Sequence, residues 1–149
     1  MRANRFVTGA CMAMALALAL SCMQAGASVG QVKTVRGEAF IERGGQRVPI
    51  AVGTAIEASD VIRTGKDGSV GISFVDNSRM ALGPRSTLAI DRFEFDSTTH
   101  DGRFEAQLRK GTLSAVSGKI AHRSPQAMTV RTRSTILAVR GTEFVVRAK

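Results

Sequence analysis

The sequence predicts one all-β domain, a single antiparallel β-sandwich or jelly-roll-like fold, following an N-terminal secretion signal. From Gly30 onward, apolar residues alternate with polar ones at a period of two, and no stretch of a dozen residues has helical spacing. Glycine, asparagine, aspartate and proline interrupt these runs at short intervals, as in proteins built from many short strands. A length of 149 residues is that of one domain. We expect about a dozen strands within residues 28–149 and a helix content near zero.

Residues 1–27 have the three parts of a secretion signal peptide. Arg2 and Arg5 form a basic start, residues 6–20 are uncharged and apolar, and Ala25-Gly26-Ala27 supplies the small residues that signal peptidase needs. Cleavage after Ala27 would release the domain. The apolar run is also close to the roughly 20 residues of a spanning helix, so an uncleaved membrane anchor is the alternative.

Both cysteines, Cys11 and Cys22, lie in this segment, so cleavage after Ala27 would leave a domain without disulfides or thiolate metal ligands. Residues 18–22 also form a degenerate lipobox, in which a lipoprotein signal would end at residue 21 and Cys22 would be acylated. Ala19 stands where a good lipobox has leucine. Acylation would hold the protein at a membrane surface.

Alternating apolar residues predict the strands and the side of each strand that faces the core. Val70, Ile72 and Phe74 alternate with Gly71 and Ser73, as expected for a half-buried antiparallel strand. Other predicted core residues with this spacing are Met80, Leu82, Leu88, Ile90, Phe93, Phe95, Phe104, Ala106, Leu108, Phe144 and Val146.

Short turn sequences predict the hairpins. Gly44-Gly45 joins Ala39–Arg43 to Gln46–Ile50, which is the spacing of a two-residue hairpin loop. Asp76-Asn77 separates two further strands, and asparagine tolerates positive φ better than most residues. Aspartates at strand ends are expected to accept hydrogen bonds from backbone amides; these are Asp60, Asp67, Asp76, Asp96 and Asp101.

A weak internal echo relates the two ends of the domain. Residues 35–41 and 139–145 each place glycine after arginine and phenylalanine three residues later. A glycine in a strand allows close packing. The echo predicts that the first and last strands occupy comparable, adjacent places.

Five segments in order resemble the FecR periplasmic domain family: residues 60–65, 70–78, 82–88, 110–113 and 130–146. The resemblance spans residues 32–146 and implies an all-β extracytoplasmic domain used for protein interaction. The residues that match its motifs are Asp60, Thr64, Gly65, Phe74, Asp76, Asn77, Pro84, Ser86, Gly111, Gly141, Thr142 and Phe144.

The chain departs from the pattern of this family in two ways. Ser59 and Asn77 stand where the family usually has glycine, both at predicted turns. Founding members are sigma-factor regulators that carry a cytoplasmic anti-sigma segment and a transmembrane helix before the domain. The sequence shows neither part, so signalling to a sigma factor is not expected of it.

No grouping of residues predicts catalysis, a cofactor or a metal. His100 and His122 are the only histidines, and neither lies in a metal-binding spacing. No serine lies in a G-x-S-x-G elbow, and no phosphate-binding glycine motif occurs. A base-stacking platform needs exposed aromatics, and the chain has no tyrosine or tryptophan, so nucleic acid is not an expected partner.

The excess of positive charge is the feature of the sequence that most directly indicates a binding function. Without Arg2 and Arg5, 19 basic residues remain against 12 acidic ones, a net charge of +7, which draws a domain to polyanions. Arg131, Arg133, Arg140 and Arg147 are predicted on the last strands, with Arg131 and Arg133 on one face. They form either a cationic patch for an acidic partner or an ordinary solvated face. The sequence does not decide whether Met128 and Val130 face the core, so the register of this strand is left open.

These observations predict an exported, non-enzymatic binding module in the periplasm or at the outer membrane. Its partner would be another envelope protein, bound through the domain surface or an exposed sheet edge. One alternative is a cationic envelope-attachment protein that binds lipopolysaccharide or another acidic surface. The second is a carbohydrate-active enzyme on a jelly-roll scaffold. Membrane contact is expected only if Cys22 is lipidated or the signal stays uncleaved.

Overall fold

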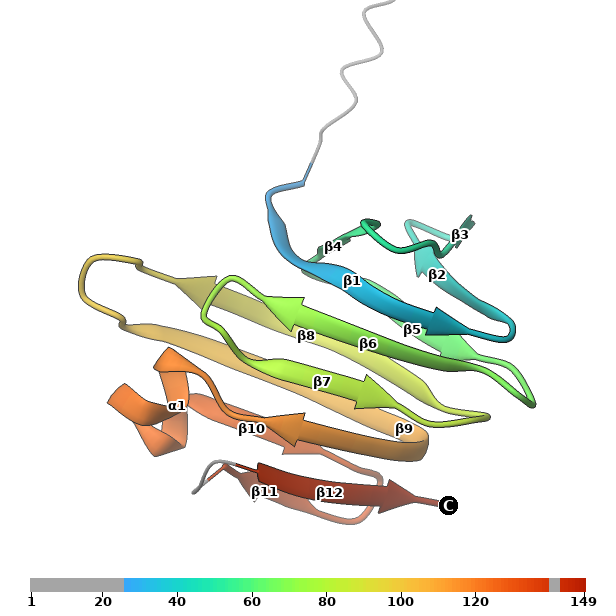
Figure 1. Cartoon of the computed structure of the whole chain (residues 1–149). Helices are drawn as coiled ribbons and strands as arrows, with labels where there is room; N and C mark the ends of the chain where they lie inside the picture. Colours follow the sequence, from blue (N-terminus) through green and yellow to red (C-terminus); the bar gives the residue numbers. More distant parts are fainter. Residues whose placement is uncertain (1–25, 140–142) are drawn as a thin grey trace, which may run out of the picture.

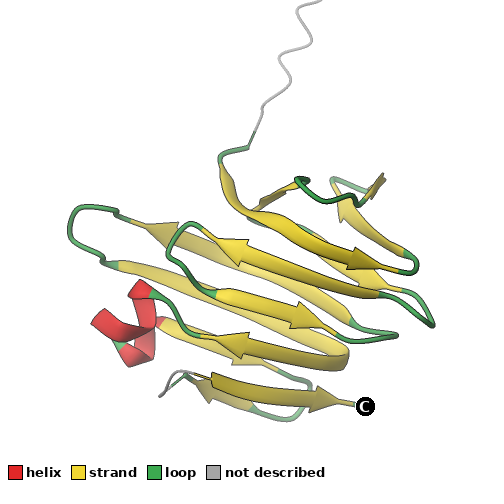
Figure 2. Ribbon diagram, viewed as in Figure 1, coloured by secondary structure: helices red, strands yellow, loops and turns green. Residues whose placement is uncertain are grey.

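A computed structural model describes residues 26–139 and 143–149 (Figure 1). These residues form twelve strands, one short α-helix and one 3-10 helix, and Figure 2 shows how strongly strands dominate. In chain order the elements are β1 (Ser28–Arg36), β2 (Ala39–Arg43), β3 (Gln46–Pro49), β4 (Ala55–Glu57), β5 (Val61–Thr64), β6 (Ser69–Phe74), β7 (Arg79–Leu82), β8 (Thr87–Phe95), β9 (Gly102–Val116), α1 (Lys119–Arg123), the 3-10 helix Pro125–Ala127, β10 (Met128–Arg131), β11 (Ile136–Ala138) and β12 (Glu143–Ala148).

The strands form one curled sheet whose two halves face each other across the core. The front half runs β4-β1-β6-β7-β9-β12, and the back half runs β3-β2-β5-β8-β9-β10-β11 (Figure 1). The long strand β9 belongs to both halves, because its first part pairs with β8 and its second part with β7 and β12. It bends at Gly111, whose φ is +95°. The predicted all-β, sandwich-like fold is confirmed.

Aromatic and aliphatic side chains from both halves meet in the core. The ring of Phe74 on β6 lies 5.6 Å from that of Phe93 on β8 and 4.7 Å from that of Phe104 on β9. Every predicted core residue is buried except Phe95 and Phe144, which are partly buried and pack against the core. Period-two alternation therefore identified the interior correctly.

Both predicted hairpins are confirmed. β2 pairs with β3 across Gly44-Gly45, and β6 pairs with β7 across the turn that contains Asn77. Asn77 has φ +68° and Ser59 has φ +73°, so both departures from the family pattern fall where glycine would be unstrained. The turn positions inferred from the sequence are therefore right.

The expectation of almost no helix is wrong in one place. Residues 119–123 form α1, and residues 125–127 form a 3-10 turn. The backbone N–H of Lys119 donates to the carbonyl of Asp76 at 2.7 Å, while Ile120 and Ala121 are buried. One turn of helix places only these two apolar side chains on the core, too few for a periodic sequence signal.

Strand order corrects two further expectations. β10 runs parallel to β9, with Met128 opposite Phe104, so the pairing is not antiparallel throughout. β12 pairs with β9, whereas β1 pairs with β4 and β6, so the adjacency predicted from the internal echo is wrong. The first copy of the echo crosses the turn between β1 and β2 at Gly37, φ +62°, and is not one strand.

The predicted signal peptide, with Cys11 and Cys22, lies almost wholly outside the described residues. β1 begins at Ser28, the first residue of the predicted mature domain. Within residues 26–139 and 143–149, no helix has the length and apolar character that crossing a bilayer requires.

Candidate interaction surfaces

Three of the motif residues, Thr64, Ser86 and Gly111, shape one end of the sandwich. The Thr64 hydroxyl donates to the carbonyl of Gly83 at 2.7 Å and accepts the N–H of Ser86 at 2.8 Å. The Ser86 hydroxyl in turn accepts the N–H of Thr112 at 3.0 Å. Gly111 is needed here, because a Cβ at this positive φ would collide with Ser86. The bend of β9 is thereby fixed against the turn between β7 and β8.

Backbone hydrogen bonds extend this contact across three turns. The N–H of Gly65 donates to the backbone carbonyl of Glu38 at 2.8 Å, and the N–H of Arg85 donates to the backbone carbonyl of Gly65 at 2.9 Å. Gly83 N–H donates to Thr112 at 3.0 Å. The β1–β2, β5–β6 and β7–β8 turns and the β9 bend thus form one surface, which we call the bend end (right in Figure 1).

Asp76 and its neighbours anchor the opposite end. The Asp76 carboxylate accepts the hydroxyl of Ser78 at 2.6 Å and the N–H of Ser78 at 3.0 Å. Ser78 Oγ also accepts the N–H of Gly118 at 3.0 Å. Asp76 and Ser78 are fully buried, so this motif joins the β6–β7 hairpin to the segment leading into α1.

Asp60 makes the most buried ion pair. Arg43 donates from Nε to Oδ1 at 2.7 Å and from Nη2 to Oδ2 at 2.6 Å, while the Asp60 side chain is 0% exposed. Arg43 also bonds Glu57 at 2.7 Å. The hydrogen bond to Asp60, with its negative charge and that of Glu57, raises the pKa of Arg43. The predicted role of Asp60, Asp76 and Asp96 as acceptors from backbone amides is confirmed.

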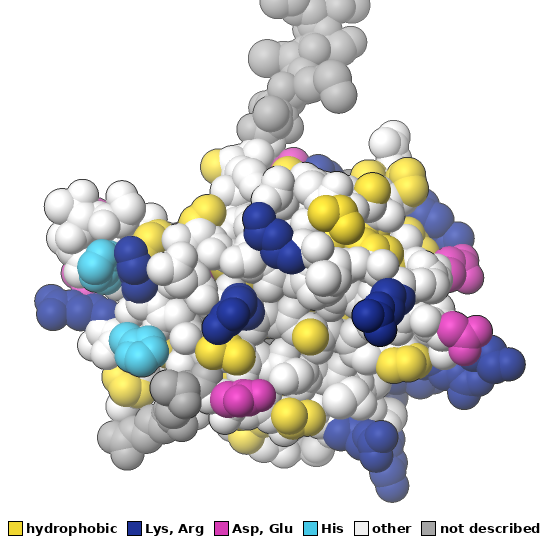
Figure 3. Space-filling view, viewed as in Figure 1, with side chains coloured by type: hydrophobic (Ala, Val, Ile, Leu, Met, Phe, Trp, Pro, Cys, Tyr) yellow, Lys and Arg dark blue, Asp and Glu magenta, His cyan; other side chains and the backbone are white. Residues whose placement is uncertain are grey.

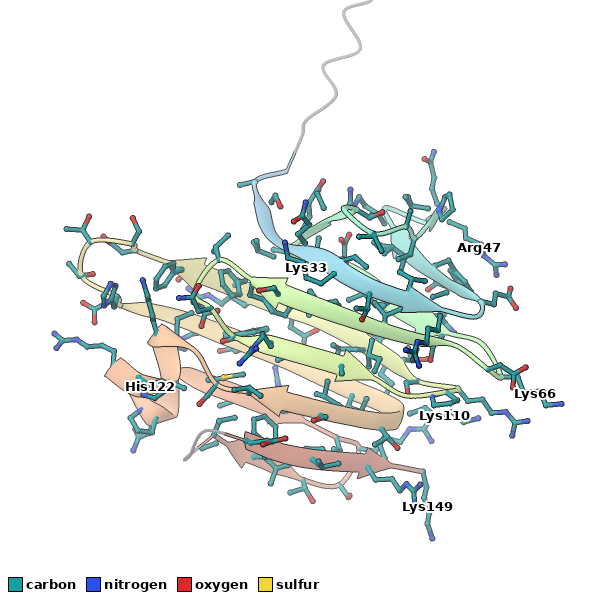
Figure 4. All side chains as sticks on the ribbon, in the orientation of Figure 1. Lys33, Arg47, Lys66, Lys110, His122 and Lys149 are labelled. Atoms are coloured by element: carbon teal, nitrogen blue, oxygen red, sulfur yellow. The ribbon has the colours of Figure 1, made fainter. Side chains whose placement is uncertain are left out.

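The bend end carries a cationic hollow of about 300 Å³. We call it the cationic hollow; it is lined by Pro84, Arg85, Lys110, Gly111, Thr112, Arg147, Ala148 and Lys149. Four of these residues are basic and none is acidic. Lysine and arginine side chains project from this end in Figure 3, with acidic side chains also visible at its edge. Figure 4 shows Lys110, Lys149 and Lys66 at this end and His122 at the far end.

The four arginines predicted as a cationic patch are distributed differently. Arg131 ends β10 in the back half, and Arg147 lies on β12 in the front half; both are exposed. Arg133 lies in the loop between β10 and β11, so its predicted strand position is wrong. Met128 and Val130 are fully buried, which settles the register of β10. Arg140, with Gly141 and Thr142, lies outside the described residues.

Sequence reasoning missed Arg85 and Lys110 as partners of Arg147. The sequence shows only that each of them is next to a turn residue: Arg85 follows Pro84, and Lys110 precedes Gly111. Nothing in the sequence joins the two turns, which are 26 residues apart at the contact of Ser86 with Thr112.

The side of the sandwich formed by β11 and β12, which we call the open side, exposes two strand edges. Among the described strands, β12 pairs with β9 alone and β11 with β10 alone. Each carries a strongly exposed apolar side chain, Val145 at 67% and Ile136 at 69%. Leu137 and Phe144 are only partly buried against the core. Unpaired strand edges with apolar side chains can pair with a further strand.

The other two edge strands are less suited to pairing. β4 has three residues, and β3 ends in Pro49, which has no N–H to donate. β12 has six residues and no proline.

Neither histidine belongs to a group of possible metal ligands among the described residues. His100 stacks on Phe95 with a ring separation of 6.2 Å, and His122 is exposed on α1. Within the described part of the chain, no three histidine, cysteine or acidic residues lie close enough to hold a metal ion.

These features define an all-β sandwich domain with a cationic end and an open side. Residues 60–149 match the family described as FecR protein. The chain belongs to the FecR family. A solved structure described as a cell surface anchoring domain is 28% identical to it with a TM-score of 0.41, covering 42% of this chain and 83% of that chain. No curated protein matches significantly.

Proposed function

We propose that this protein is an exported interaction module of the bacterial cell envelope that acts by binding another envelope protein. Membership of the FecR family supports an extracytoplasmic interaction domain. The buried carboxylates Asp60 and Asp76 are occupied by hydrogen bonds within the chain, which favours a structural role for them over catalysis.

The open side carries this proposal. A partner strand pairing with β12 would satisfy backbone groups that point away from β9 and would cover apolar surface. Along β12, Glu143, Val145 and Arg147 are exposed, while Val146 is buried. A partner strand would therefore meet one apolar side chain between two of opposite charge.

Site-specific photo-crosslinking in producing cells tests this contact. A photoreactive phenylalanine analogue would replace Val145 on β12 or, as a matched control, Val52 in the β3–β4 loop. Both valines are 67% exposed, so they differ in location and not in accessibility. We expect one discrete protein adduct from position 145, retained in moderate salt because backbone pairing and apolar contact resist screening.

A second variant examines whether the contact is specific. Val145→Lys places a charge on the apolar contact and should abolish co-purification of the crosslinked partner without changing the thermal unfolding of the domain. Equal adducts from positions 52 and 145, or no adduct from 145, would refute the proposal.

A further inference from the structure

We propose that the cationic hollow at the bend end binds the phosphate group of an anionic ligand, either a free phosphorylated molecule or a lipid headgroup. This site is separate from the strand edge invoked above and does not depend on it. Arg85, Lys110, Arg147 and Lys149 come from three parts of the chain and line one hollow with no acidic residue.

The positive charges of the hollow are not neutralised within the described part of the chain. All ion pairs among the described residues are made by arginines outside the hollow: Arg43, Arg63, Arg92, Arg103 and Arg123. No described carboxylate lies within 4.0 Å of the side-chain nitrogens of the four basic residues of the hollow. Like charges gathered at one concave surface repel each other and raise the local concentration of anions. A bound anion would relieve that repulsion.

The floor of the hollow is fixed before any ligand arrives. The N–H of Thr112 donates a hydrogen bond to Ser86 Oγ, and the carbonyl of Thr112 accepts one from the N–H of Gly83. Arg85 N–H is held by Gly65. These bonds occupy backbone groups of Thr112 and Arg85, so at these two residues only side chains are free to bind a ligand. A fixed frame lowers the entropy lost on binding.

Arg85 stands in a conformation that its side-chain type disfavours. Its φ is +51°, in the left-handed region where glycine or asparagine is less strained. Arg85 follows Pro84 in the β7–β8 turn, and its side chain is exposed and makes no ion pair with a described residue. The turn thus holds the start of this basic side chain in a defined backbone conformation beside the hollow.

Phosphate fits the hollow better than a carboxylate does. Guanidinium groups bind phosphate oxygens in a two-pronged geometry, and lysine adds mobile donors. Two arginines and two lysines can meet several oxygens of one doubly charged group, whereas a carboxylate offers two oxygens and one charge. The volume of about 300 Å³ suits a single headgroup.

Titration of the exported protein with inorganic phosphate, followed by amide NMR shifts, tests the site. We expect saturable shifts at Arg85, Thr112 and Arg147, weaker ones with acetate, and affinity that falls as salt rises. The double variant Arg85→Asn/Arg147→Gln should weaken phosphate binding by about tenfold or more. Asparagine tolerates positive φ, so Arg85→Asn should keep or raise the thermal stability.

Arg79→Gln is the control for loss of a basic side chain outside the site, because Arg79 is exposed at the start of β7 and does not line the cationic hollow. It should change the affinity by less than about twofold. Equal losses in the control and the double variant, absence of saturable shifts, or equal binding of acetate would overturn the proposal.

Vesicles distinguish the two sources of phosphate. Co-sedimentation with phosphatidylcholine vesicles would be compared with and without phosphatidylglycerol. Arg85-dependent binding to the anionic vesicles identifies a lipid headgroup as a ligand. Phosphate-induced shifts without vesicle binding identify a free phosphorylated molecule.

Discussion

Arg43 binds the fully buried carboxylate of Asp60 with two hydrogen bonds, of 2.7 Å from Nε and 2.6 Å from Nη2. Asp60 belongs to the family motif, whereas Arg43 precedes the Gly44-Gly45 turn. The pair joins the β2–β3 hairpin to the start of β5.

Arg43→Met should lower the free energy of unfolding by about 3 kcal/mol, because it leaves a buried carboxylate without its counter-charge. Urea denaturation measures the change. Arg92→Met is the control, since its pair with Glu94 is exposed on both sides and should cost less than about 1 kcal/mol. Equal losses in the two variants would contradict the role assigned to Asp60.

Gly111→Ala should destabilise the domain by about 3 kcal/mol, because the new methyl group would collide with Ser86 and strain the bend of β9. Gly45→Ala is the control that measures the cost of positive φ alone, without a collision of the new methyl group. Gly45 also has positive φ, but no atom lies within 4 Å of the place that a Cβ would take, so about 1 kcal/mol is expected. Thermal unfolding of both variants measures the two costs; similar values would show that the close approach to Ser86 is unimportant.

Ser59→Gly should stabilise the domain by about 0.5 kcal/mol, because glycine accepts φ +73° without a Cβ penalty. The hydrogen bond from Ser59 N–H to Ile90 at 2.8 Å would be kept. Asn77→Gly serves as comparison and should change stability little, because asparagine already tolerates its φ of +68°. A loss of stability in Ser59→Gly would mean that the serine side chain contributes more than its backbone strain costs.

The pKa of Asp96 should lie below the ordinary value of 3.8, because its carboxylate accepts backbone N–H groups of Thr99 and Thr98. The folded state then binds the proton less readily than the unfolded state. Its contribution to stability is therefore present above pH 3.8 and is lost as the pH falls through the lower, folded value.

An NMR titration of the Asp96 carboxyl group measures this pKa directly. The amide shifts of Thr98 and Thr99 should titrate with the same midpoint and lose that response in Asp96→Asn. A midpoint at or above the ordinary value would contradict the hydrogen bonding of the β8–β9 loop.

The sequence by itself determined the strands, the turns and the side of each strand that faces the core. Alternation predicts the burial of Val70, Ile72 and Phe74, and residue type predicts the turn at Asn77, because both are properties of neighbouring residues. The motif residues Thr64, Ser86 and Gly111 were identified through the resemblance of the sequence to the FecR family.

Only the tertiary structure decided which distant segments meet. β9 pairs with strands of both halves and runs parallel to β10, and no local pattern encodes that choice. The short α1 forms because Ile120 and Ala121 fill the core beside the β6–β7 hairpin. The cationic hollow arises in the same way, because the bend at Gly111 lets Lys110, Arg147 and Arg85 line one surface although they lie far apart in the sequence.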